Sequence, residues 1–422
     1  MENKVFSKVA WRLFPFIGLL YVACFLDRVN VGFAALTMNK DLGISDTAFG
    51  LGSGIFFIGY FFFEVPSNVI LARVGARAWI CRIMITWGLV SMAMSLAQGE
   101  YSMYLLRFLL GVAEAGFFPG IVYYLTHWFP GTMRGRFMAM FLAAIALANI
   151  IGAPLSSFLL GLDGLHGLYG WQWMFVIEGI PAILLGVCVL FLLPDAPEHA
   201  KWLNAEEKQI VHDRLAQDPP ADHDSLWAMM RDVRVWLLAI PDFGIVLGLY
   251  GIGLWLPQIV KTLGYTNIQT GFIVALPYVL SVVAMIAWGM SSDRRGERFW
   301  HTSIAATLAA VSLFAAALLG TSLLSVFALA IATVGIYAAL SVFWTIPPSF
   351  LTGTAAAGGI ALINSIANLG GFFGPSIMGY LKTLTGNYTL GFATLGVAQV
   401  MAAILVLALA GTVRRRAAQP AE

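Results

Sequence analysis

Four charged side chains of this sequence lie inside long apolar stretches. Asp27 and Arg28 are adjacent in the middle of one stretch, and Arg107 and Glu114 lie seven residues apart in another. In a helix, that spacing turns Arg107 and Glu114 to nearly the same side, about 10 Å apart. If these stretches cross a bilayer, each charge costs about 2.5–3.5 kcal/mol near its centre, so retained charges predict binding of ions or protons. Mutual pairing of the two cations with the two anions is the alternative that requires no function.

The second half of the chain has neutral polar groups in its apolar stretches instead of charges. Ser341 and Trp344 lie one helical turn apart, and so do Asn364 and Asn368. The nearest acid is Asp242, close to the start of its stretch. This asymmetry suggests that the first half holds charge and protons, while the second half shapes and hydrogen-bonds a ligand.

Three more polar residues of the first half have less specific interpretations. The hydroxyl of Tyr60 needs a partner at depth, either a ligand or a neighbouring helix. Glu64 lies one turn further along, near the end of its stretch, and is expected to pair with a loop arginine rather than with a substrate. Glu178, at the head of its stretch, is interpreted as structural.

The composition explains why these charges stand out. Of 422 residues, 59% are hydrophobic and only 11% are charged, whereas a soluble chain has about 25% charged residues. The net charge of +2 argues against a nucleic-acid partner. Cys24, Cys81 and Cys188 lie in apolar runs without CxxC spacing, so we expect core residues and neither a disulfide framework nor a metal site.

Twelve stretches are long enough to cross a membrane as helices, which requires about 20 residues each. Alternation of the barrel-strand kind is absent. The sequence therefore predicts an all-α integral membrane protein with twelve transmembrane helices. The predicted spans are 12–36, 49–72, 78–97, 101–125, 137–160, 172–193, 235–259, 269–291, 301–320, 323–346, 356–380 and 389–411.

Basic residues and one polar segment define the topology. Nineteen Lys and Arg fall on one side of the predicted membrane and three on the other, which places both termini in the cytoplasm. Residues 194–232 hold 13 of the 46 charges and form a cytoplasmic connector. We therefore expect two six-helix bundles, 1–193 and 233–422, in a bacterial inner membrane.

Two landmarks suggest that the halves are duplicated. The loop that contains Gly289, Asp293, Arg294 and Gly296 aligns with residues 68–77 at an offset of 221 residues. At the same offset, Pro154 falls on Pro375. Repeats of this kind place a substrate site near the bilayer midplane, between bundles that move against each other. Close helix packing and a bend explain the Gly/Pro clusters around these prolines equally well.

Known enzyme motifs are missing from the sequence. It contains no GxxxxGK[ST] run for ATP and no HExxH zinc motif, and its six histidines lie at span ends, in loops or in the connector. We expect no enzymatic activity, no ATP, no metal and no cofactor.

Several motifs resemble those of a known family. The twelve spans, the connector and the Gly289-xxx-Asp293-Arg294-x-Gly296 loop resemble the major facilitator superfamily. Residues 25–32 (FLDRVNVG), 63–68 (FEVPSN) and 107–119 (RFLLGVAEAGFFP) are similar to its anion:cation symporter branch. That branch includes proton-driven bacterial carriers of tartrate, galactonate, glucarate and phthalate, and animal carriers of sialic acid and glutamate.

The resemblance implies roles for individual residues. Arg28 would contact the substrate carboxylate, Asp27 and Glu114 would titrate, and Arg107 would pair with Glu114. The loop residues Gly289, Asp293, Arg294 and Gly296 would serve the inner gate or the structure. The positions that match the sugar-acid site of the galactonate carrier are Tyr60, Ser341, Trp344 and Asn364.

This chain also departs from the family pattern at two places. The galactonate carrier has a glutamine where residues 143–145 read Ala-Ala-Ile here, which suggests a less hydroxylated or differently shaped substrate. Asn68 and Ala72 replace the Gly and Asp of the superfamily loop, which argues against a charge pair at that side of the inner gate.

These observations predict proton-coupled import of a small organic carboxylate, such as tartrate or an aldonate, by alternating access. The proton gradient and the membrane potential would drive a monomer. The alternatives are a carrier of aromatic acids of the phthalate or hydroxyphenylacetate type, another mode of anion movement or export, and a membrane sensor that binds solute without moving it.

Overall fold

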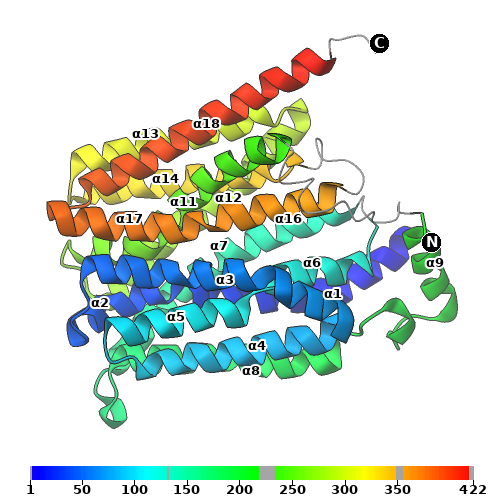
Figure 1. Ribbon diagram of the computed structural model, residues 1–422, viewed down its shortest axis with the longest axis horizontal. Helices are drawn as coiled ribbons and strands as arrows, with labels where there is room; N and C mark the ends of the chain where they lie inside the picture. The colour runs from blue at the N-terminus through cyan, green and yellow to red at the C-terminus, as the bar shows by residue number, and fades with distance from the viewer. Residues whose placement is uncertain (1, 131–132, 218–232, 348–354, 418–422) are drawn as a thin grey trace.

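The computed structural model describes residues 2–130, 133–217, 233–347 and 355–417, and all regular secondary structure in these ranges is helical. Its exterior carries many exposed large apolar side chains, as a surface in contact with lipid requires. Figure 1 shows the helices of the two halves as two groups that pack side by side.

The helices of the N-terminal half are α1 (Glu2–Val29), α2 (Val31–Asp41), α3 (Asp46–Val74), α4 (Ala76–Ala93), α5 (Glu100–Glu114), α6 (Phe117–Thr126), α7 (Arg134–Leu159) and α8 (Gly170–Leu192). The short α9 (Ala205–Leu215) follows. The helices of the C-terminal half are α11 (Val233–Lys261), α12 (Asn267–Arg295), α13 (Phe299–Leu319), α14 (Leu323–Phe343), α16 (Ala355–Asn368), α17 (Gly370–Thr385) and α18 (Thr389–Ala417). Short 3₁₀ turns cover Met94–Leu96, Leu160–Leu162, Leu165–Gly167 and Pro197–His199.

Eleven helical segments of the described chain are long and apolar enough to cross a membrane. They match the predicted spans except 356–380, which consists of α16 and α17, with 14 and 16 residues. Three of the predicted spans, 12–36, 101–125 and 356–380, are interrupted helices. The breaks occur at Asn30, at Ala115–Gly116 and at Leu369. At Gly116 the left-handed φ of +86° explains the break, since glycine adopts that conformation without strain. The first helix also begins ten residues before the predicted start of its span.

The connector docks on the start of α1. The Lys8 ammonium donates to both carboxylate oxygens of Glu207 at 2.8 Å, and Arg214 lies 3.1 Å from Glu2. The hydrogen bond from Lys8, followed by that from the backbone of Asn204, lowers the pKa of Glu207. Figure 1 shows α9 beside the beginning of α1, at the same end of the bundle as the end of α18. Residues 218–232 of the predicted connector lie outside the described residues.

Close helix crossings join the two halves at the opposite end. The main helix pairs that cross between halves are α3 with α17, α7 with α12, and α2 with α11. Glycines allow these approaches: a Cβ at Gly32 would lie 2.9 Å from the carbonyl oxygen of Leu254. Lys382 of α17 forms a 2.8 Å ion pair with Asp46 at the start of α3. This end is therefore closed by both backbone packing and polar contacts.

Gly289, Asp293 and Arg294, which matched the superfamily pattern, lie in the last turns of α12, and Gly296 follows directly after it. Asp293 pairs with Arg298 at 2.5 Å, so its ion pair joins the end of α12 to the short loop before α13. Gly296 ends α12 in a left-handed conformation, with a φ of +61°. Arg294 is exposed, and a Cβ at Gly289 would have no neighbour within 4 Å.

A glycine on α5 sets the distance between two helices of the site. A Cβ at Gly111 would overlap the carbonyl oxygen of Phe56 and lie 3.0 Å from the backbone nitrogen of Tyr60. We expect Gly111→Ala to destabilise the fold by about 1–3 kcal/mol, because backbone cannot yield as a side chain can. Gly18→Ala on α1, where nothing lies within 4 Å, is the matched control and should keep the wild-type melting temperature. Equal melting temperatures for the two variants in detergent would contradict this account.

Candidate functional site

Two helix ends bring the four predicted charges together. Asp27 and Arg28 lie in the last turn of α1, and Glu114 is the last residue of α5, with Arg107 two turns before it. Asp27, Arg107 and Glu114 are fully buried, and Arg28 is 7% exposed. All four side chains therefore lie inside the helix bundle and not on its lipid-facing surface.

Glu114 is held by Arg28 and Cys24 of α1. The Arg28 guanidinium forms an ion pair with Glu114 through Nη2 and Oε1. The Cys24 thiol donates to the same oxygen at 3.0 Å. Arg28 Nη1 also donates to the hydroxyl of Tyr250 on α11 at 3.1 Å, so Arg28 joins the two halves. The Arg28 guanidinium carbon lies 4.7 Å from the centre of the Phe25 ring and 5.3 Å from that of Tyr60.

The expected pairing of Arg107 with Glu114 is wrong. Arg107 Nη2 donates to the backbone carbonyl of Ser53 at 3.1 Å, and its guanidinium carbon lies 4.9 Å from the centre of the Phe56 ring. Its Nη1 and Nε have no hydrogen-bond partner within the described part of the chain. Seven residues of helix separate Arg107 and Glu114 by about 10 Å, while the packing of α1 brings Arg28 directly to Glu114.

Asp27 pairs with no cation among the described residues, which corrects the alternative that all four charges are mutually paired. The Trp87 indole donates to Oδ2 of Asp27 at 2.7 Å, and the Ser91 hydroxyl donates to Oδ1 at 2.8 Å. Both donors come from α4. Neighbouring residues of a helix point about 100° apart, so Asp27 and Arg28 face different helices although they are adjacent.

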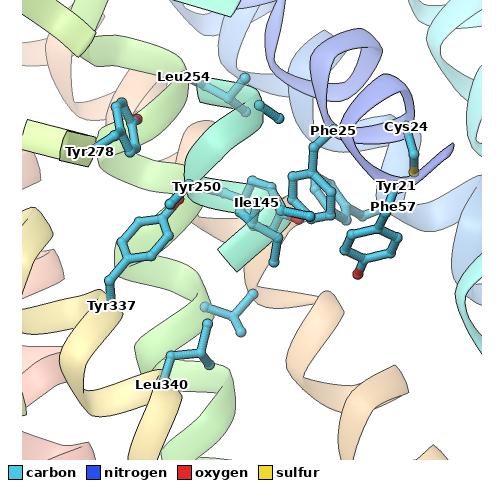
Figure 2. Close-up of a cluster of buried hydrophobic side chains, with 14 of the residues drawn as sticks. Tyr21, Cys24, Phe25, Phe57, Ile145, Tyr250, Leu254, Tyr278, Tyr337 and Leu340 are labelled. Atoms are coloured by element: carbon cyan, nitrogen blue, oxygen red, sulfur yellow. The ribbon is translucent and has the colours of Figure 1, made fainter. Parts of the chain in front are cut away.

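A central cavity lies between the two halves, with a free volume of about 70 Å³. That is room for a few water molecules, so the site is nearly closed. Figure 2 shows Tyr21, Phe25 and Ile145 of the N-terminal half around the same space as Tyr250 and Leu340 of the C-terminal half. The full lining is Tyr21, Phe25, Arg28, Tyr60, Phe118, Ile145, Asp242, Val246, Leu249, Tyr250, Leu340, Trp344, Asn364 and Asn368.

Four of the five predicted substrate-binding residues line this cavity: Arg28, Tyr60, Trp344 and Asn364. Ser341 does not line it, and its hydroxyl donates to the carbonyl of Ala338, one turn back on α14. Asp27, Glu114 and Arg107 lie behind the cavity wall, so they reach a ligand only through neighbouring groups.

Sequence reasoning missed the role of Tyr250. It lines the cavity and hydrogen-bonds Arg28, yet it is one of 13 tyrosines and belongs to no motif. Its place in a long apolar stretch, where a phenol needs a partner, was the only available signal.

Glu64 also departs from its prediction. The hydroxyl of Ser365 on α16 donates to Oε2 of Glu64 at 2.7 Å, so the partner is a serine of the opposite half and not a loop arginine. This contact is a further polar link between the halves, in addition to Arg28–Tyr250 and Lys382–Asp46. Glu178 accepts a 2.7 Å hydrogen bond from Ser156 of α7, in keeping with the structural role expected of it.

Comparison with known proteins places this site in a family. Residues 17–375 match the sequence pattern of the Major Facilitator Superfamily. The chain is 52% identical over 414 residues to a protein of Agrobacterium vitis named "Putative tartrate transporter", covering 97% of this chain and 92% of the relative. It is 44% identical over 423 residues to the "Quinolone resistance transporter" of Acinetobacter baumannii, covering 99% and 98%.

The fold leads to the same family. The D-xylose-proton symporter superimposes with a TM-score of 0.75 at 15% identity, covering 94% of this chain and 97% of that structure. At this identity the likeness concerns the fold alone. The sequence match spans most of the chain, and the chain therefore belongs to the major facilitator superfamily, as a multi-pass membrane transporter.

Proposed function

We propose that this protein imports a small organic carboxylate together with protons, by alternating access. The observation that carries the proposal is the buried ion pair of Arg28 and Glu114 at the edge of the central cavity. A guanidinium at depth attracts a carboxylate and holds it through charge-assisted hydrogen bonds. Glu114 already forms an ion pair with that guanidinium, so the carboxylate of Glu114 and a substrate carboxylate compete for the same cation.

Protonation decides that competition. A protonated Glu114 no longer offsets Arg28, and the substrate anion takes its place beside the guanidinium. When the cavity opens toward the cytoplasm, water enters, Glu114 releases its proton and pairs with Arg28 again, and the anion leaves. Asp27, next to Arg28 on α1, accepts hydrogen bonds from Trp87 and Ser91 of α4. It is the second titrating group in this scheme.

The direction of transport follows from charge. A cycle that carries more protons than substrate charges is driven inward by about 2.3 kcal/mol per charge per 100 mV.

We place both termini in the cytoplasm, with twelve spans in a bacterial inner membrane, on the strength of the 19-to-3 distribution of Lys and Arg. We expect a monomer that works without ATP, metal or cofactor. Asp293 and Arg294 would act at the inner gate, supported by Gly289 and Gly296.

Tartrate is the first substrate to test. The relatives named for tartrate are 52% and 51% identical to this chain over nearly its whole length. Tyr60, Asn364 and Asn368 line the cavity and suit the hydroxyls of such an acid. An aromatic acid is the second candidate, because Tyr21, Phe25, Phe118 and Trp344 give the same cavity aromatic faces.

The proposal is tested in two steps. Purified protein is screened by thermal shift against tartrate, galactonate, phthalate and hydroxyphenylacetate, and binding of at least one acid is expected. Uptake of the labelled acid is then measured in proteoliposomes while the pH gradient and the voltage are collapsed separately. Loss of accumulation on collapsing the pH gradient supports proton symport. Accumulation that follows the voltage or a chloride gradient alone would refute it.

A further inference from the structure

We propose that Asp242 is a proton-binding residue of the C-terminal half, and that its proton is shared with the bound substrate anion. This inference rests on the proposed function. Asp242 lies on α11 and lines the central cavity with Arg28 and Tyr250. It is fully buried, and neither of its carboxylate oxygens has a hydrogen-bond partner among the described residues.

Asp242 differs in this respect from the other buried acids of the described chain. Asp27 accepts from Trp87 and Ser91, and Glu114 accepts from Arg28 and Cys24. Glu64 and Glu178 each accept a hydrogen bond from a serine hydroxyl. An ionised carboxylate buried without any donor is strongly unfavourable, so Asp242 requires a proton, a cation or a ligand.

The groups around Asp242 do not supply a cation. The titratable residues that share its cavity are Arg28, Tyr21, Tyr60 and Tyr250, and Arg28 is already bound to Glu114 and Tyr250. Of the helices packed against α11, α14 and α12 carry Tyr337 and Tyr278 at depth. In the described parts of α2, α16, α17 and α18, Lys, Arg, His, Asp and Glu occur only at Lys40, Asp41, Lys382 and residues 414–416. Lys40, Asp41 and Lys382 lie toward the end where Lys382 pairs with Asp46, and the three arginines 414–416 belong to the last turn of α18 at the other end of the bundle.

An anion entering this cavity selects the protonated form of Asp242. An ionised Asp242 would repel the substrate, whereas a protonated one donates its O–H to a carboxylate or hydroxyl oxygen of the substrate. The proton comes from water on the outer side. It stays on the Asp242 oxygen while the anion is bound and returns to water when the cavity opens inward. No covalent bond of the substrate changes, and the two halves of the protein then each contribute a proton to the cycle.

The test measures protons taken up when tartrate binds. Calorimetry of purified full-length protein in two buffers of different ionisation enthalpy gives that number, and the pH dependence of the dissociation constant gives it independently. We expect Asp242→Asn to take up one proton fewer than wild type, so its affinity changes about tenfold less per pH unit. Asp213→Asn, the same substitution at an exposed aspartate of α9, should match wild type. Unchanged proton uptake in Asp242→Asn would overturn the inference.

Two further measurements separate the alternatives. Replacing sodium by choline at constant pH should leave wild-type binding unchanged. A sodium dependence that disappears in Asp242→Asn would show that the site takes a metal cation and would refute the proton. Asp242→Ser is the second neutral variant if the asparagine variant does not fold.

A failure of the proposed function is distinguishable from a failure at Asp242. If wild type binds none of the acids, the proposed substrate class is wrong. Infrared spectroscopy of the ligand-free protein still measures whether Asp242 takes up a proton. As the pH is lowered, the carbonyl stretch of protonated carboxyls should grow in wild type, grow less in Asp242→Asn and grow as in wild type in Asp213→Asn. Equal bands in all three proteins would refute protonation of Asp242.

Discussion

Replacing Arg28 with alanine is expected to weaken tartrate binding by at least about 100-fold, which is about 3 kcal/mol. Among the residues that line the cavity, Arg28 is the one with a fixed positive charge, and its second contact, to Tyr250, crosses between the halves. Isothermal titration or tryptophan fluorescence of the purified variant measures the loss.

The folding control for this prediction uses the partner of Arg28. Alanine at position 28 leaves Glu114 buried without its cation, which costs about 3–5 kcal/mol and can unfold the variant. The double variant Arg28→Ala with Glu114→Gln removes both charges, so it should fold and still not bind. Arg28→Lys keeps the charge but loses the planar fork and should bind weakly. Wild-type affinity in the double variant would show that the anion site lies elsewhere.

Glu114→Gln is expected to abolish proton-driven accumulation while keeping tartrate binding and exchange. The neutral amide no longer competes for Arg28, so binding should become tighter and less dependent on pH. In proteoliposomes with an inward proton gradient, the ratio of internal to external substrate should fall to about unity, since an uncoupled carrier only equilibrates its substrate.

Glu178→Gln is the matched control for Glu114→Gln. Glu178 is also fully buried in the N-terminal half, but its contact is the hydroxyl of Ser156 and it does not line the cavity. This variant should accumulate substrate like wild type. If Glu114→Gln still concentrates substrate against its gradient, the coupling role of Glu114 is wrong.

The limits of sequence-based prediction are visible within single helices. The hydropathy pattern located α3, α8 and α11 to within a few residues, because each crosses lipid and must be apolar over a defined length. The break at Gly116 has a local signal in the glycine. The break at Asn30 has none, since Asn30 keeps right-handed helical dihedral angles.

The site, too, has residues that the sequence predicts correctly and residues whose orientation depends on helix packing. Arg28, Tyr60, Trp344 and Asn364 were assigned from motif resemblance and do line the cavity. Ser341 lies one turn from Trp344, but its hydroxyl is bound to its own helix. Helical spacing indicates which residues share a face, but the rotation of that face about the helix axis depends on the neighbouring helices.

The amino-acid sequence alone showed that this protein lies in a lipid bilayer. It also located most of the helices and identified the charged residues within them. These properties follow from transfer free energies that add up along a continuous stretch, so they can be read residue by residue. Only the tertiary structure decided which charges meet. Arg28 pairs with Glu114, 86 residues away, and Asp27 accepts hydrogen bonds from α4, while Asp242 has no donor within the described residues. Such pairings depend on the crossing and rotation of helices that are distant in the chain, because hydrogen bonds and ion pairs change steeply over about 1 Å.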